Sequence, residues 1–108
     1  MPKPLLPPAQ MKAQAEKAVS LLKLLGNEDR LLLLCQLAQE EYSVGQLEDI
    51  LEINQPTLSQ QLGVLRRARL VATRREGKQV HYRAADEAAI AVINTLFELY
   101  CNGADKQR

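Results

Sequence analysis

The sequence predicts a mainly α-helical fold that contains one small β-hairpin. Apolar residues recur at helical spacing in five segments, and one pair of β-prone runs flanks a glycine turn. The helical segment just before that pair carries Gln, Thr and Ser on its polar face, and the pair itself is basic. Short hydrogen-bonding side chains suit base edges and basic ones suit phosphates, so the element order α-α-α-α-β-β-α predicts a DNA-binding winged helix-turn-helix.

The chain has 108 residues, enough for one domain with a modest core. We predict a disordered N-terminal arm at 1–8, the domain at 9–102 and a C-terminal tail at 103–108. No apolar run approaches the roughly 18 residues of a membrane span, and the N-terminus has too short an apolar stretch for a signal peptide. These features predict a cytoplasmic protein without a membrane partner, where a structural disulfide is not the default.

Two helices are predicted first, at 9–25 and at about 28–39. Gly26 can end the first, and Asn27 can cap the second. The apolar face of the first helix consists of Met11, Ala15, Ala18, Leu22 and Leu25. The apolar face of the second consists of Leu31, Leu34, Cys35 and Ala38.

The next two helices form the predicted helix-turn-helix. Ser43 and Gln46 have the spacing of a capping box and open a short helix that ends at about Glu52. Its inward residues are expected to be Leu47, Ile50 and Leu51. After a tight turn, Asn54 caps a helix that extends to Arg67, and Pro56 stands in its first turn, where a missing N–H costs little.

A hairpin and one more helix complete the domain. The runs 71–75 and 79–83 are β-prone and are separated by Glu76, Gly77 and Lys78. Asp86 caps the last helix, whose stripe is Ile90, Ile93, Phe97 and Cys101. A domain of this size cannot cover the apolar stripes of both its first and last helices, which predicts a homodimer through them. The alternative is that these two helices pack on each other.

The charge of the chain is concentrated in one segment. The net charge is only +1, but residues 66–83 hold seven of the fourteen Lys and Arg residues and a single acid, Glu76. This distribution predicts a local contact with a polyanion. The candidate DNA contacts are Gln55, Thr57, Ser59, Gln60, Arg66, Arg74, Arg75, Lys78, Gln79, His81 and Arg83. Because strand residues alternate between faces, the hairpin members of this set cannot all face DNA.

The segments 55–62, 65–66 and 80–83 together resemble the ArsR-type winged-helix repressors, over about residues 15–102. The resemblance implies a homodimer, not an enzyme, that binds a palindromic operator in double-stranded DNA and releases it when an inducer arrives. The helix at 54–67 would be the recognition helix and the hairpin at 71–83 the wing. One departure is Arg69, which stands where relatives often have a left-handed glycine. Either this helix ends differently, or Arg69 offsets a cost of about 1 kcal/mol through a phosphate contact.

Many members of that family sense metals, but the aligned ligand positions are not retained here. Paired cysteines of one known site fall on Ser43 and Gly45. The zinc site on the last helix aligns with Asp86, Ala88, Leu99 and Asn102. Of these only Asp86 can ligate zinc, and a helix cap accounts for it. Because these ligand residues are missing, we expect neither a metal nor a cofactor at these sites.

Cys35 and Cys101 give the chain a resemblance to the BigR-like branch of the family. It implies a dithiol switch in which a persulfide or another oxidant bridges the pair by a disulfide or polysulfide, so that the operator is released. Four alternatives remain open. The cysteines could fill the core, or bind a thiophilic ion such as arsenite, copper(I) or mercury(II). The chain could be a thiol-disulfide enzyme, although it lacks Cys-x-x-Cys and a histidine near either thiol, or an interaction module without DNA binding.

Overall fold

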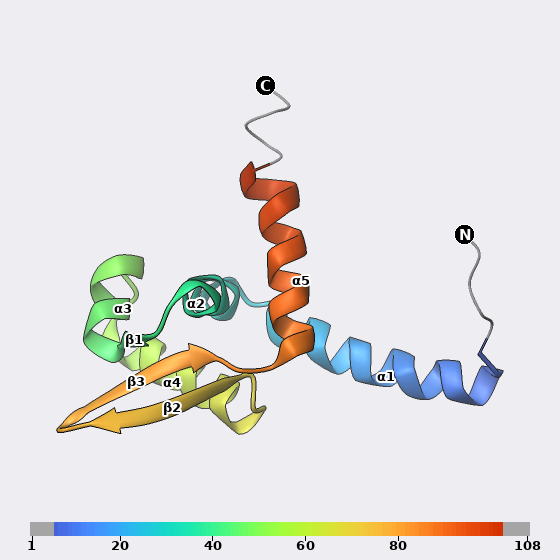
Figure 1. Cartoon of the computed structure of the whole chain (residues 1–108), viewed down its shortest axis with the longest axis horizontal. Coiled ribbons are helices and arrows are strands. Elements are labelled where there is room, and N and C mark those ends of the chain that lie inside the picture. The colour runs from blue at the N-terminus through green and yellow to red at the C-terminus, as the bar shows by residue number, and fades with distance from the viewer. Residues whose placement is uncertain (1–5, 103–108) are drawn as a thin grey trace.

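The structure, a computed structural model, describes residues 6–102 and confirms the predicted fold class (Figure 1). The expected arm up to residue 5 and the tail at 103–108 lie outside the described residues. The elements are α1 (Pro8–Leu25), α2 (Glu28–Gln39), β1 (Tyr42–Ser43), α3 (Val44–Leu51), α4 (Gln55–Arg67), β2 (Val71–Glu76), β3 (Gln79–Ala84), α5 (Glu87–Phe97) and the π-helical turn η1 (Glu98–Asn102).

Four helices begin with the cap that the sequence predicts. Each cap side chain accepts a hydrogen bond from the backbone N–H three residues further on, which satisfies a donor that the helix leaves free. The caps are Asn27, Ser43, Asn54 and Asp86. Ser43 also forms the complete capping box, because Oε1 of Gln46 accepts from its backbone N–H at 2.8 Å.

The end of α4 retains the left-handed geometry that glycine usually supplies. Arg69 has φ +64°. Its N–H donates to the carbonyl of Arg66 at 3.0 Å, and the N–H of Leu70 donates to the carbonyl of Leu65 at 2.9 Å. These two bonds define a Schellman motif, and the buried side chains of Leu65 and Leu70 supply the apolar contact that accompanies it. The first alternative for Arg69, a different helix end, is therefore wrong.

The core lies where α2, α3 and α4 meet one another and the sheet. Its fully buried side chains are leucines: Leu33, Leu34, Leu47, Leu58, Leu62 and Leu65. The expectation for Ile50 is wrong, since this residue is 45% exposed. In a helix of only 8 residues the inward face is narrow, and the i, i+4 partner of Leu47, Leu51, occupies the position nearer the core.

The sheet contains one strand more than predicted. Its order is β1-β3-β2, with Tyr42 opposite Tyr82 and Ser43 opposite His81. A two-residue strand has no periodicity to detect, and Ser43 also serves as a helix cap. The predicted hairpin is present with each strand one residue longer, and Gly77 takes a left-handed φ of +63° in its turn.

The first and last helices extend away from this core (Figure 1). All residues of α1 up to Ser20 are exposed, and only its C-terminal turn packs on the domain. In α5, by contrast, Ile93 is 3% exposed and packs in the core, so its expected place on an outer dimer stripe is wrong. The π-helical turn also interrupts the stripe after Phe97, because its wider spacing rotates Cys101 away from the α-helical series.

Candidate nucleic-acid interface and cysteine pair

The helix α4 separates its leucines from its polar residues. Leu58, Leu62 and Leu65 face the core, whereas the candidates Gln55, Ser59 and Gln60 are exposed and Thr57 is half-buried. The hydroxyl of Ser59 donates to Oε1 of Gln55 at 2.7 Å, a bond that turns the amide nitrogen of Gln55 away from Ser59. The side chains of Gln55 and Gln60, which are predicted to contact DNA, therefore lie on the exposed face of α4.

The strand register divides the wing candidates between two faces of the hairpin. Arg74 lies opposite His81, Ala72 opposite Arg83 and Glu76 opposite Gln79, so these residues share one face. The other face carries buried Val71 and half-buried Thr73 and Tyr82 and packs toward α2. Arg75 is on that second face, but it lies exposed near the turn, beyond the core. The outer face thus gathers Arg74, Gln79, His81 and Arg83.

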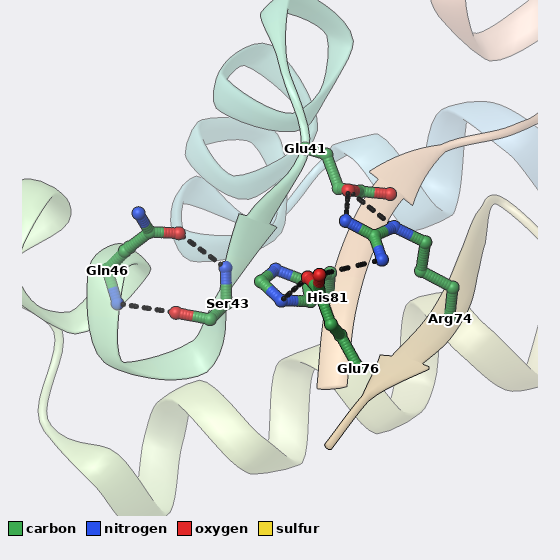
Figure 2. A network of polar contacts seen from close by, with 6 residues as sticks. All are labelled: Glu41, Ser43, Gln46, Arg74, Glu76 and His81. Atoms are coloured by element: carbon green, nitrogen blue, oxygen red, sulfur yellow. Dashed lines mark hydrogen bonds and ion pairs between the residues drawn. The ribbon is translucent and has the colours of Figure 1, made fainter. Parts of the chain in front are cut away.

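Arg74 is already engaged by carboxylates of its own chain (Figure 2). Its Nε and Nη2 lie 2.8 and 2.7 Å from Oε1 of Glu41, and its Nη1 lies 3.4 Å from Oε1 of Glu76. The hydrogen bond from Arg74 to Glu41 raises the pKa of the Arg74 guanidinium. Arg74 must therefore exchange a carboxylate for a phosphate in order to contact DNA.

His81 lies beside this ion pair (Figure 2), and its side chain is largely buried. Its side chain is 15% exposed, and Nε2 lies 3.5 Å from Oε1 of Glu76, within ion-pair range for a protonated imidazole. Within residues 6–102, Nε2 has no hydrogen-bond partner. The strand β1, which was not predicted from the sequence, pairs with β3 at His81 and helps to bury it. The remaining cationic and amide candidates of this region are exposed: Arg66, Arg75, Lys78, Gln79 and Arg83.

The two cysteines are free thiols in different environments. Cys35 is half-buried on α2 and helps to line a pocket of about 300 Å³ together with Ala38, Ile93 and Phe97. Cys101 is exposed in η1. Burial raises the pKa of the Cys35 thiol, and the charge of Cys101 raises it further.

Residues 6–102 contain neither a candidate metal cluster nor a candidate membrane-spanning helix. No three or more His, Cys, Asp or Glu side chains in this part of the chain are grouped so as to hold a metal ion. The same part contains no helix long and apolar enough to cross a membrane.

Three residues that hydrogen-bond within this region were not predicted from the sequence: Arg30, Glu41 and Gln61. Glu41 binds Arg74 across 33 positions of sequence, and Arg30 binds Gln61 across 31. Such pairs depend on tertiary packing and leave no local spacing signal. For Arg30 the sequence offered one hint, since it is a cation in the first turn of a helix, where the dipole disfavours positive charge.

Comparison with known protein families gives a match to the central part of the domain. The model described as "Bacterial regulatory protein, arsR family" matches residues 27–73. The chain is similar to the "Biofilm growth-associated repressor" of Agrobacterium fabrum, with 51% identity over 96 residues, which cover 89% of this chain and 82% of that protein. It is also 46% identical to the "Transcriptional activator HlyU" of Vibrio cholerae, over 85% of either chain.

Solved structures agree with this similarity. The transcriptional repressor BigR from Xylella fastidiosa superimposes with a TM-score of 0.81 at 44% identity, over 89% of this chain and 98% of that one. The reduced form of HlyU from Vibrio cholerae gives a TM-score of 0.82 at 46% identity, over 85% and 97%. The similar proteins are transcriptional regulators rather than enzymes.

Proposed function

The chain belongs to the ArsR family of bacterial regulatory proteins and is a transcriptional repressor of the BigR kind, and we propose that bridging of its two cysteines is the signal that releases it from DNA. The observation that carries this proposal is the position of the cysteines. Cys35 lies on α2, which packs against both α4 and α5, and Cys101 lies in the turn that continues α5. A covalent link between them would tie the support of α4 to the last helix.

The DNA contacts are assigned to α4 and the wing. Gln55 and Gln60 would read base edges, with Thr57 and Ser59 on phosphates. Exposed cations around them would bind the backbone. The proposed set is the one predicted above: Gln55, Thr57, Ser59, Gln60, Arg66, Arg74, Arg75, Lys78, Gln79, His81 and Arg83. Its enclosed position gives His81 the weakest access.

The functional unit proposed is a homodimer built on α1 and the outer part of α5. Met11, Val19 and Leu22 on α1 and Phe97 and Leu99 beyond the core are exposed apolar side chains. Apolar surface of this extent on a small domain is typical of a protein contact, and a two-fold dimer can place two copies of α4 one DNA turn apart, at about 34–36 Å. The palindromic operator follows from that symmetry.

The proposed chemistry needs no cofactor. One thiol takes the outer sulfur of an organic persulfide, R–S–SH, and becomes Cys–S–SH while R–SH leaves. The other thiol then attacks the inner sulfur, so that a disulfide joins the cysteines and hydrogen sulfide departs. Transfer of further sulfur before closure would give a polysulfide. The pocket beside Cys35 offers a small reagent access to the less exposed thiol.

The test uses Cys35→Ser and Cys101→Ser on a duplex selected from random DNA by the wild-type protein. Serine resembles a reduced thiol in size, so each variant should bind this operator with wild-type affinity, and neither should be released by persulfide, disulfide or peroxide. If either serine variant is still fully released from the operator by one of these reagents, the proposal of a two-cysteine switch is wrong. Stoichiometric binding of arsenite, copper(I) or mercury(II) to reduced but not to bridged protein, with release of DNA, would instead support the metal-sensing alternative.

A further inference from the structure

The guanidinium of Arg30 joins three helices. Arg30 belongs to the first turn of α2. Its Nε donates to the carbonyl of Leu24 at 2.7 Å and its Nη2 to the carbonyl of Lys23 at 3.3 Å, both in the last turn of α1. Its Nη1 donates to Oε1 of Gln61 on α4 at 2.9 Å. One side chain therefore contacts the exposed helix α1 and the DNA-reading helix α4 at the same time.

The contact with α1 has a clear physical basis. The last carbonyls of a helix lack the donors of a further turn and form the negative end of its dipole, so a cation there is favourable, although the carbonyl of Lys23 also accepts from the N–H of Gly26. Beyond this turn α1 extends from the domain and bears the exposed Met11, Val19 and Leu22. The direction of α1 relative to the rest of the protomer is thus set close to Arg30.

The contact with α4 falls at a sensitive position. Gln61 is half-buried between the buried Leu58 and Leu62 and the exposed Gln60 on the same helix. Leucines define how deeply α4 packs, but the hydrophobic effect is non-directional and restrains rotation about the helix axis less than a hydrogen bond with a preferred angle does. A hydrogen bond from a charged donor to Gln61 restrains this rotation, which decides where the amides of Gln55 and Gln60 point.

We propose that Arg30 is a positioning residue that couples the orientation of the dimer helix α1 to the rotation of the recognition helix α4. This inference rests on the proposed function, because it supposes that α1 dimerises and α4 binds DNA. Arg30 itself need not contact DNA. Its planar fork supplies donors in several fixed directions, whereas the single ammonium of lysine can cap α1 without also reaching Gln61 in that geometry.

The proposal is tested by a double-mutant cycle of Arg30→Met and Gln61→Met. The quantity measured is the discrimination ratio, the Kd for a random duplex divided by the Kd for the duplex selected by the wild type. Each single variant should lower this ratio about tenfold, within the range usual for coupling between sites. The double variant should lower it no further, since either change already breaks the link. Arg30→Lys should behave like Arg30→Met.

Several results would overturn the proposal. If Arg30 and Gln61 affect the discrimination ratio independently of each other, the two tenfold losses would multiply to about a hundredfold. If Arg30 is merely structural, Arg30→Met would lower the melting temperature and leave the ratio unchanged. Gln39→Met is the matched control, because Gln39 is exposed and its amide bonds to a carbonyl of its own helix; it should leave the ratio unchanged.

Hydrogen exchange on the DNA-free protein separates this inference from the proposed function. Arg30→Met should accelerate exchange of the α4 amides several-fold more than Gln39→Met does, because the restraint on α4 is lost without DNA being involved. Equal exchange in the two variants would overturn the coupling even if DNA binding holds. If Arg30→Met accelerates exchange in α4 but the wild-type protein binds no duplex in preference to random DNA, the proposed function is wrong while the link through Arg30 stands.

Discussion

Replacement of Glu41 by glutamine should strengthen DNA binding and make it more sensitive to salt. Glu41 holds Arg74 through two short contacts, 2.7 and 2.8 Å, on the outer face of the wing. The change Glu41→Gln would retain the size of the side chain and remove its charge. Arg74 then keeps a single ion pair, the longer 3.4 Å contact with Glu76, and its guanidinium becomes more readily available to a phosphate.

The size of the effect follows from counterion release. Each phosphate contact on duplex DNA contributes about 0.9 to the slope of log K against log salt, so the variant should steepen the slope by about 1.8 where Glu41 still holds Arg74 in both wings of the DNA-bound wild-type dimer. Doubling the salt concentration should then weaken the variant roughly 3.5-fold more than it weakens the wild type. Fluorescence anisotropy titrations of a random duplex and of the selected operator, over a series of salt concentrations, measure both slopes.

Glu40→Gln is the matched control for this measurement. Glu40 is exposed and adjacent in sequence, and the change removes the same charge without touching the Arg74 contact. It should alter the slope by much less than Glu41→Gln does. Equal effects of the two variants would show that general charge, rather than release of Arg74, is responsible. A wild-type slope together with a wild-type affinity for Glu41→Gln would refute the assignment of Arg74 to DNA, whereas a wild-type slope with tighter binding would show that Arg74 already exchanges Glu41 for a phosphate in the wild type.

Three further predictions concern single side chains. Arg69→Gly should stabilise the fold by about 1 kcal/mol in thermal or urea unfolding, because glycine accepts φ +64° without strain; a destabilised variant would contradict this. Alkylation of Cys35 should keep accelerating with pH beyond the point where an ordinary thiol levels off, because its pKa is raised; mass spectrometry follows this rate, and an ordinary profile would refute it. Leu22→Glu should yield a folded monomer in sedimentation, whereas Ile50→Glu, a matched exposed site, should remain dimeric; dimeric Leu22→Glu would exclude this face of α1.

Local sequence signals predicted the helices and their beginnings well. Asn27, Ser43, Asn54 and Asp86 act within three residues of their own position, so their capping bonds could be predicted without knowing the fold. The hairpin turn at Gly77 is equally local. The family resemblance added an expectation that such signals cannot give, namely a switch made of Cys35 and Cys101.

Features that depend on tertiary packing were mispredicted or absent from the prediction. Ile93 shares a helical stripe with Phe97, but only the position of α2 decides that Ile93 is buried in the protomer. The strand β1 exists because Tyr42 meets Tyr82, forty positions later in the chain. The ion pair of Glu41 with Arg74 also depends on tertiary packing. A count of basic residues treats every cation of the hairpin as free to bind a phosphate, whereas this ion pair already occupies Arg74.

The central claim is that bridging Cys35 to Cys101 releases the operator, and one titration tests it directly. Wild-type protein on its selected operator is treated with increasing organic persulfide, and each sample is divided between anisotropy and intact mass spectrometry. We predict that the fraction of protein carrying an internal bridge equals the fraction released at every point, and that a thiol reductant restores both. Fully bridged protein that remains on the operator, or release without a bridge, would contradict the account.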